Sequence, residues 1–327
     1  MSSFLGVALG VLLLIGGGTA LVTGASQLAA RLGISPLIIG LTIVGFGTSA
    51  PELVVNVMGA MRGETGLAFG NVVGSNIANL ALVLGLSALF REIEIHGTLV
   101  RREIPLLLLV TSVITVMALD HPIDGSVPLI GRSDALVLLL LFGIFVYITV
   151  QDVVRAPRSE PLIAEIEENP IIVTTPGARL NWLWILLGFL LLFAGGEVTI
   201  RAGVALSQQL GVSAAVIGLF VVAVGTSMPE LVTSVIAAMR KESDLALGNL
   251  VGSNMFNSLI VLPASGLAGP ILVPKGGVSD LIFTWILTAA LIPIFFLGKA
   301  KLGPRTGAML LIAYFSYGWF RIRYNFS

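Results

Sequence analysis

Two glutamates carry the clearest chemical signal in the chain. Glu52 and Glu230 lie inside strongly apolar stretches, and no basic residue lies near either glutamate to neutralise it. Burying an ionisable side chain in an apolar helix is costly, so such a residue marks a functional site by default. If the fold brings the two carboxylates together, they repel unless one binds a proton or a cation lies between them. Oxygen ligands with little nitrogen and no sulfur favour Ca²⁺, Na⁺ or H⁺ over transition metals.

A proline precedes each glutamate. Pro51 and Pro229 interrupt runs that otherwise have the pattern of a helix. A proline there removes a backbone hydrogen bond and displaces the carbonyl four residues earlier, which belongs to Gly47 or Gly225. Irregular backbone at membrane depth is tolerated where it is buried in protein or lines a polar cavity. A packing kink would explain one such proline, but Pro-Glu at both places favours an ion site. Four hydroxyl side chains beside the freed carbonyls are candidate ligands: Thr48, Ser49, Thr226 and Ser227.

The two glutamate segments are copies of each other. Residues 47–79 and 225–257 match at one constant offset, with Gly-Thr-Ser-x-Pro-Glu-Leu followed in each copy by Gly-Asn-x-x-Gly-Ser-Asn. Thr48 and Glu52 are four residues apart and so share one helix face. The second motif adds a serine and an asparagine at the same spacing in each copy, namely Ser75 with Asn79 and Ser253 with Asn257. Two oxygen-bearing helix faces can therefore meet around an ion.

The same segments contain residues suited to helix packing. Gly70 and Gly74, like Gly248 and Gly252, have the small-xxx-small spacing that lets another helix approach closely in a membrane. The remaining repeated asparagines are predicted mainly to form hydrogen bonds between helices, and they are Asn71, Asn76, Asn249 and Asn254.

The composition indicates an integral membrane protein. The chain is 56% hydrophobic and 11% charged, and its mean hydropathy is +1.01, which is far too apolar for a soluble domain of this length. Runs of about 20 apolar residues, enough to cross the hydrocarbon core, occur near residues 4–25, 36–60, 66–90, 103–120, 133–151, 181–201, 214–238, 244–268, 278–297 and 305–322. We therefore expect an all-α polytopic membrane protein with ten transmembrane helices, some of them broken at the ion site.

Ten helices divide into five for each copy. An odd number makes the second copy enter the membrane from the opposite face, so the sequence predicts two inverted repeats, 1–151 and 181–327, with their motifs at 45–79 and 223–257. The polar segment 152–180 is predicted to be a solvated cytoplasmic tether rather than a regulatory site. The distribution of Lys and Arg over alternate loops puts both termini outside the cytoplasm. The first apolar run lacks a basic n-region, so it is expected to be a retained helix.

Other classes of function fit the sequence less well. The absence of cysteine excludes disulfides and thiolate metal sites, and the balance of 18 basic and 18 acidic residues gives no attraction to nucleic acid. An intramembrane serine hydrolase using Ser49 or Ser75 would lack a lysine or histidine base. The chain has no P-loop, so ATP use is not expected. Glu197 and Arg201, four residues apart, are expected to form an ion pair.

The duplicated motifs resemble those of the calcium/cation antiporter superfamily and are most similar to those of prokaryotic sodium/calcium exchangers. The resemblance covers essentially all of the predicted helices. It implies secondary active exchange of Ca²⁺ for Na⁺ by alternating access, in which the first and sixth helices slide against the rest. It also implies a location in a prokaryotic inner or plasma membrane and no enzymatic activity. The ions and the lipid bilayer would be the only partners required, without a cofactor or an obligatory protein partner.

The resemblance also implies the ligands. Glu52 and Glu230 would bind Ca²⁺, with the backbone oxygens of Thr48 and Thr226 completing the site, and both glutamates would also contact Na⁺. Two flanking Na⁺ sites and the position between the glutamates would use the following groups: the Gly45 carbonyl, Ser49 and Ser75 on one side, the Ala223 carbonyl, Ser227 and Ser253 on the other, and Asn79 and Asn257 in the middle.

One of these residues departs from the family pattern. Well-studied members usually have aspartate at the position of Asn257, so this site holds two formal negative charges. One Ca²⁺ balances two charges, whereas three Na⁺ would leave a positive surplus. The coupling ion therefore stays open: exchange of Ca²⁺ or another divalent cation for H⁺ is the alternative to Na⁺/Ca²⁺ exchange, and a passive cation channel is a weaker one.

Overall fold

The computed structural model describes most of the chain as helix. The described residues are 3–63, 65–95, 97, 99–119, 127–155, 178–209, 225, 227–297 and 300–326. Most of the predicted tether 152–180 lies outside them, as do Ala223 and Thr226. The helices before the tether are α1 Ser3–Leu32, α2 Pro36–Ile39, η1 Gly40–Val44, α3 Gly45–Thr48, α4 Ala50–Met61, α5 Thr65–Ile77, η2 Ala78–Val83, α6 Leu84–Phe90, η3 Leu99–Glu103, α7 Ile104–Met117 and α9 Arg132–Arg155. Those after it are α11 Ala178–Gln209, α14 Met228–Met239, α15 Ser243–Phe256, η5 Asn257–Val261, α16 Leu262–Ala268, α17 Gly277–Leu297 and α18 Pro304–Phe326.

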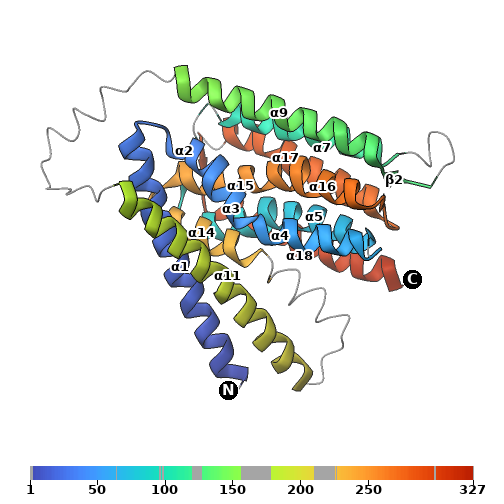
Figure 1. The fold of residues 1–327 in the computed structure, drawn as a ribbon, viewed down its shortest axis with the longest axis horizontal. Helices are drawn as coiled ribbons and strands as arrows, with labels where there is room; N and C mark the ends of the chain where they lie inside the picture. Colours follow the sequence, from blue (N-terminus) through green and yellow to red (C-terminus); the bar gives the residue numbers. More distant parts are fainter. Residues whose placement is uncertain are drawn as a thin grey trace, which may run out of the picture.

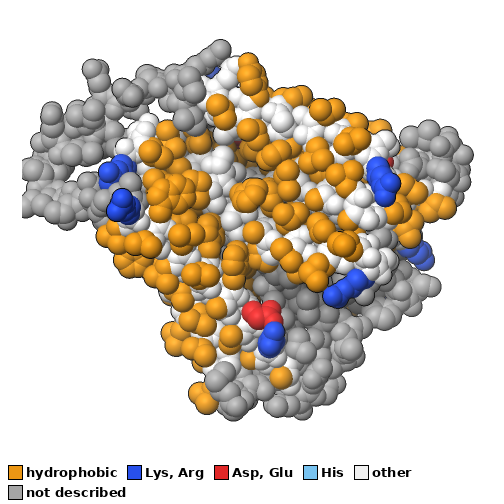
Figure 2. Space-filling view, in the orientation of Figure 1, with side chains coloured by type: hydrophobic (Ala, Val, Ile, Leu, Met, Phe, Trp, Pro, Cys, Tyr) orange, Lys and Arg blue, Asp and Glu red, His pale blue; other side chains and the backbone are white. Residues whose placement is uncertain are grey.

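The helices fit a membrane-spanning bundle. Six of the described helical runs are long and apolar enough to cross a membrane, and a seventh results if the pair Pro36–Thr48 and Ala50–Met61, bent by 44°, is one span. Each predicted apolar run coincides with described helix, except for the first part of 214–238, which lies outside the described residues. Figure 2 shows a face covered largely by apolar side chains, with few charged ones. Such a surface suits contact with lipid.

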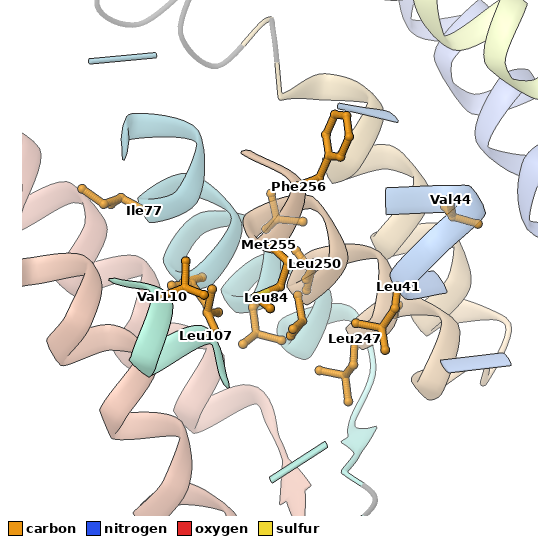
Figure 3. Packing of buried hydrophobic residues seen from close by; sticks show 14 of the residues in the cluster. Leu41, Val44, Ile77, Leu84, Leu107, Val110, Leu247, Leu250, Met255 and Phe256 are labelled. Carbon is orange, nitrogen blue, oxygen red and sulfur yellow. The ribbon is translucent and has the colours of Figure 1, made fainter. Parts of the chain in front are cut away.

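Two helical runs form the interior of the bundle. In an apolar 18-residue window of each run, 94% of Ser243–Ala268 and 78% of Ala68–Phe90 are buried, whereas the shares for Arg132–Gln151 and Arg179–Thr199 are only 22% and 28%. Figure 3 shows Leu84, Leu250 and Met255 of the two inner runs packed beside Leu107 and Val110 of α7. The two inner runs carry the second motif of each copy, so the repeated serines and asparagines lie at the centre of the protein.

The long helices α1 and α11 lie side by side and extend away from the rest of the bundle (Figure 1). Glycines let their backbones approach closely. A Cβ atom on Gly17 would lie 2.7 Å from the backbone nitrogen of Leu192, and one on Gly188 would lie 2.7 Å from that of Leu21. These are the close approaches that small residues allow between membrane helices.

Short strand pairs connect the two halves of the chain. β1 Ile93–Glu94 pairs antiparallel with β4 Lys301–Leu302, with Ile93 opposite Leu302. β2 Leu129–Ile130 pairs in the same way with β3 Ile271–Leu272. Each pair joins a loop of the first half to a loop of the second.

Three π-helical segments interrupt the helices near the repeated motifs. η1 precedes Gly45, whereas η2 and η5 begin at or beside the equivalent residues Asn79 and Asn257. Such segments occur mostly as single turns within α-helices and frequently at functional sites. The proline breaks were predicted from the sequence, whereas these π-helical segments were not.

Candidate functional site

The two glutamates begin new helices at equivalent breaks. Ser49 caps α4 with φ −87° and ψ 3°, and Ser227 caps α14 with φ −88° and ψ 8°. Each helix has its proline in the first turn, where a missing N–H is tolerated. The predicted break is therefore confirmed at Pro51 as a 44° bend. In the second copy the described helix α14 begins at Met228, and its cap at Ser227 has the same geometry.

Both glutamates are buried at the centre of the structure. Each is 1% exposed, and the two carboxyl groups lie close enough for a charge on Glu230 to repel a charge on Glu52. The Ser49 hydroxyl donates to Oε1 of Glu230 over 3.0 Å. Among the described residues, Oε2 of Glu230 and both carboxylate oxygens of Glu52 have no hydrogen-bond partner. The fold thus brings together two acidic side chains, and neither forms an ion pair with a basic side chain of the described residues.

Two asparagines add oxygens of the same kind. Nδ2 of Asn79 donates to Oδ1 of Asn254 over 3.0 Å, and Nδ2 of Asn257 donates to Oδ1 of Asn76 over 3.3 Å. Within the described part of the chain, Oδ1 of Asn79 and Oδ1 of Asn257 are buried and have no partner. Buried polar atoms are almost always satisfied, because leaving them bare is costly. The described residues thus contribute five buried oxygens without a partner from equivalent positions of the two repeats, and oxygen atoms of this kind are the ligands that a hard cation such as Ca²⁺ prefers.

Hydroxyl groups surround the glutamates and connect the two repeats. Oγ1 of Thr48 donates to Oδ1 of Asn249 over 3.2 Å and lies 3.3 Å from Oγ of Ser253. Ser227 donates to Ser75 over 3.4 Å. These contacts join polar side chains of the two halves of the chain in the region of the glutamates.

The contacts mix the residues expected of the two flanking Na⁺ sites. Ser253, expected on one side, donates over 3.3 Å to the Gly45 carbonyl, expected on the other. The contacts of Ser75 with Ser227 and of Ser49 with Glu230 also join the two copies. Of the twelve predicted ligands, Thr226 and Ala223 lie outside the described residues. The ten others, Gly45 and Thr48 included, are buried.

The packing predictions have a mixed outcome. A Cβ atom on Gly252 would lie 2.6 Å from the carbonyl oxygen of Leu41, so α15 does pack backbone to backbone against the first copy. Gly70 and Gly74 meet no described residue in this way. The predicted pair of Glu197 and Arg201 is confirmed.

The predicted interhelical asparagines are confirmed at three positions. Asn76 donates to Ser258 over 3.0 Å, Asn249 donates to Ser234 over 2.8 Å, and Asn254 donates to the Asn76 carbonyl over 3.3 Å. Asn71 differs, because its Nδ2 has no partner in the part of the chain that the structure describes.

Two residues that support the glutamate backbone were not predicted from the sequence. Asn56 donates over 2.7 Å to the carbonyl of Glu52. Ser234, the equivalent residue in the second copy, accepts from Asn249, which also donates to the Glu230 carbonyl over 3.4 Å. Their position one turn after each glutamate is a signal that could have identified them.

A cavity of about 580 Å³ lies behind the first break, but its lining is mostly apolar. Six phenylalanines line it, and they are Phe46, Phe142, Phe145, Phe189, Phe193 and Phe256. Its lining includes Thr42, whose hydroxyl donates to the Ile38 carbonyl, so the polar residues around the glutamates remain the candidate ion site.

Comparison with known proteins gives consistent matches. The family model described as "Sodium/calcium exchanger protein" matches residues 2–151 and 180–323. CaxA of Alkalimonas amylolytica is 36% identical over 95% of this chain and 96% of its own length. The sodium/calcium exchanger MaX1 of Methanosarcina acetivorans is 28% identical over 97% of this chain and 92% of its own length. The structure of the sodium-calcium exchanger NCX_Mj soaked with Na⁺ superposes with a TM-score of 0.80 at 27% identity, over 96% of each chain.

Proposed function

The chain belongs to the sodium/calcium exchanger protein family, and from this premise we propose that it is a secondary active antiporter that exchanges Ca²⁺ for Na⁺ by alternating access. The observation that carries the proposal is the set of bare, buried oxygens on Glu52, Glu230, Asn79 and Asn257 among the described residues. A transported cation would compensate the glutamate charges and replace the missing hydrogen bonds at once.

In this proposal the glutamates hold Ca²⁺ together with the backbone oxygens of Thr48 and Thr226. Na⁺ binds to overlapping groups, so the two ions compete for one set of negative charges. The Na⁺ ligands are the Gly45 and Ala223 carbonyls, Ser49, Ser75, Ser227 and Ser253, with Asn79 and Asn257 between the glutamates. The burial of the ten described ligands supports these assignments.

The architecture that we propose is ten helices in two inverted repeats, 1–151 and 181–327, joined by a cytoplasmic tether at 152–180. The protein would lie in a prokaryotic plasma membrane with both termini outside the cytoplasm. The equivalent caps of α4 and α14 and the equivalent π-helical segments η2 and η5 support the duplication. Transport would need no cofactor and no obligatory protein partner.

A specific observation also favours the alternative coupling ion. Both oxygens of Glu52 have no partner within the described residues, so this carboxylate is able to take up a proton when Ca²⁺ leaves. Exchange of Ca²⁺, or of another divalent cation, for H⁺ is therefore the second candidate function.

Flux measurements on purified protein test the proposal. The protein is reconstituted into liposomes loaded with Na⁺, and uptake of radiolabelled Ca²⁺ is measured after dilution into medium with or without Na⁺. We expect uptake only with an outward Na⁺ gradient at clamped pH, and none for Glu52→Gln. Uptake that follows a pH gradient and ignores Na⁺ would select H⁺ coupling, and flux without any ion on the opposite side would indicate a channel.

A further inference from the structure

Four buried asparagines form a chain of hydrogen bonds between the two repeats. We propose that Asn76 and Asn254 are positioning residues that turn the amide oxygens of Asn257 and Asn79 toward the transported ion. This inference rests on the proposed function, because it concerns the same ion site. Neither Asn76 nor Asn254 is among the ligands assigned above.

The geometry follows the duplication. Asn76 is equivalent to Asn254, and Asn79 is equivalent to Asn257. We call Asn79 and Asn257 the inner asparagines. Each donates through Nδ2 to Oδ1 of the positioning asparagine of the other repeat, over 3.0 Å for Asn79 to Asn254 and over 3.3 Å for Asn257 to Asn76. The same crossed contact therefore occurs twice.

The direction of these hydrogen bonds decides whether the nitrogen or the oxygen of the Asn79 and Asn257 amides has no partner in the described structure. A side-chain amide carries two N–H donors at one end and an oxygen acceptor at the other. Because Nδ2 of Asn79 and of Asn257 is held by an acceptor, Oδ1 is the end without a partner in the described structure. A reversed amide would present its partially positive N–H groups to a cation and would weaken binding in a site where water does not screen the charge.

The positioning residues are themselves held in place. Nδ2 of Asn76 donates to Ser258 over 3.0 Å, and Nδ2 of Asn254 donates to the Asn76 carbonyl over 3.3 Å. Because Nδ2 of each positioning residue donates elsewhere, its Oδ1 is the end that accepts from Asn257 or Asn79. All four asparagines are at most 5% exposed, so bulk water does not provide replacement partners. Asn79 and Asn257 lie in the π-helical segments that begin at Ala78 and Asn257.

A structural role and a positioning role make different predictions. If Asn76 only joins two helices, its loss lowers stability, and the protein that remains folded binds ions as before. If Asn76 orients Asn257, its loss weakens ion binding in folded protein. The analogy is the partner that orients a metal ligand, whose removal typically lowers metal affinity by about 10–100-fold.

The experiment measures equilibrium Ca²⁺ binding and Na⁺-driven Ca²⁺ uptake for monodisperse variants of the full chain. Asn76→Leu removes the acceptor at similar volume. Asn76→Asp keeps an acceptor oxygen for Asn257, and the Ser258 hydroxyl is able to reverse and donate to it. Ser265→Ala is the matched control, because the hydroxyl of this buried serine donates over 2.8 Å to the Val261 carbonyl one turn earlier and forms no hydrogen bond to the asparagines among the described residues.

We expect Asn76→Leu to raise the Kd and the KM for Ca²⁺ by about tenfold or more. Asn76→Asp should stay within about threefold of the parent or bind more tightly, and Ser265→Ala should match the parent. Equal Kd values for parent and Asn76→Leu would overturn the inference, as would a tenfold loss in both Asn76 variants. If Asn76→Leu does not fold, Asn254→Leu gives the equivalent test through Asn79.

A double-mutant cycle adds a test that stability does not influence. If Asn76 acts through Asn257, Asn76→Leu should have no further effect on the Kd in an Asn257→Leu background, because coupled residues are not additive. Independent fold-changes that multiply would contradict the inference. Failure of the proposed function is recognised separately, since the parent itself would then neither bind Ca²⁺ nor take it up.

Discussion

Replacement of Glu52 by glutamine should increase stability and abolish exchange at the same time. Both carboxylate oxygens of Glu52 are buried without a partner in the described structure, and the side chain is 1% exposed. Glutamine removes the charge and supplies N–H donors to a region rich in acceptors. A buried polar group without a partner costs about 1–3 kcal/mol, and a charged one costs more.

The expected size of the effect follows from these values. A gain of about 1–3 kcal/mol corresponds to a rise in Tm on the order of 5 °C for a protein of a few hundred residues. The parent should gain stability when Ca²⁺ is added, by about 2.7 kcal/mol at a hundred times Kd. Glu52→Gln should lose that gain, because only one carboxylate remains to balance the ion.

Thermal unfolding in detergent, with and without Ca²⁺, measures both quantities, and liposome uptake measures exchange. Glu94→Gln is the control, since the Glu94 side chain is 61% exposed and pairs with Lys301 far from the site. Two results would refute the reasoning: a Glu52→Gln protein less stable than the ion-free parent, or one that still gains stability from Ca²⁺.

Three further predictions concern neighbouring features. Ser49→Ala removes the 3.0 Å hydrogen bond to Glu230 and should raise the KM for Ca²⁺ by about tenfold; an unchanged KM in flux assays would exclude a role for this bond. Asn257→Asp adds a third negative charge and should make the Na⁺ dependence of Ca²⁺ uptake steeper and the uptake voltage-sensitive, which Na⁺ titration at clamped potentials measures. Gly17→Ala introduces a Cβ atom 2.7 Å from the backbone of α11 and should destabilise the protein by about 1–3 kcal/mol. Gly16→Ala is the control and should not destabilise it, because its Cβ atom would lie 4.0 Å from the nearest atom of α11. Equal thermal stability of the two variants would contradict the packing argument.

The sequence predicted the parts of this site that depend on residue type and spacing. The bend at Pro51 follows from a missing N–H and a steric clash, both of which are local. The burial of Glu52 and Glu230 follows from their apolar surroundings, and the confirmed ion pair of Glu197 with Arg201 follows from helix geometry.

The parts that the sequence did not predict depend on contacts between distant segments. The bonds from Ser49 to Glu230 and from Ser253 to Gly45 join residues about half the chain apart. The π-helical segment that begins at Ala78 consists mostly of buried residues, and no simple sequence signature predicts it. The orientation of the Asn79 amide likewise depends on a partner from the other repeat.

Charge balance connects the site with obligatory exchange. In the proposed mechanism, the site must pass through a state closed to water on both sides, and an uncompensated carboxylate in that state is costly. With Glu52 and Glu230 as the acidic ligands, one Ca²⁺ balances the charge, and so do two monovalent cations. Because residue 257 is an asparagine, the site holds two negative charges. Occlusion then costs least when the bound ions carry two positive charges, so exchange of one Ca²⁺ for two monovalent cations would transfer no net charge. A third carboxylate at that position would instead favour an additional Na⁺, and the exchange would then carry net charge.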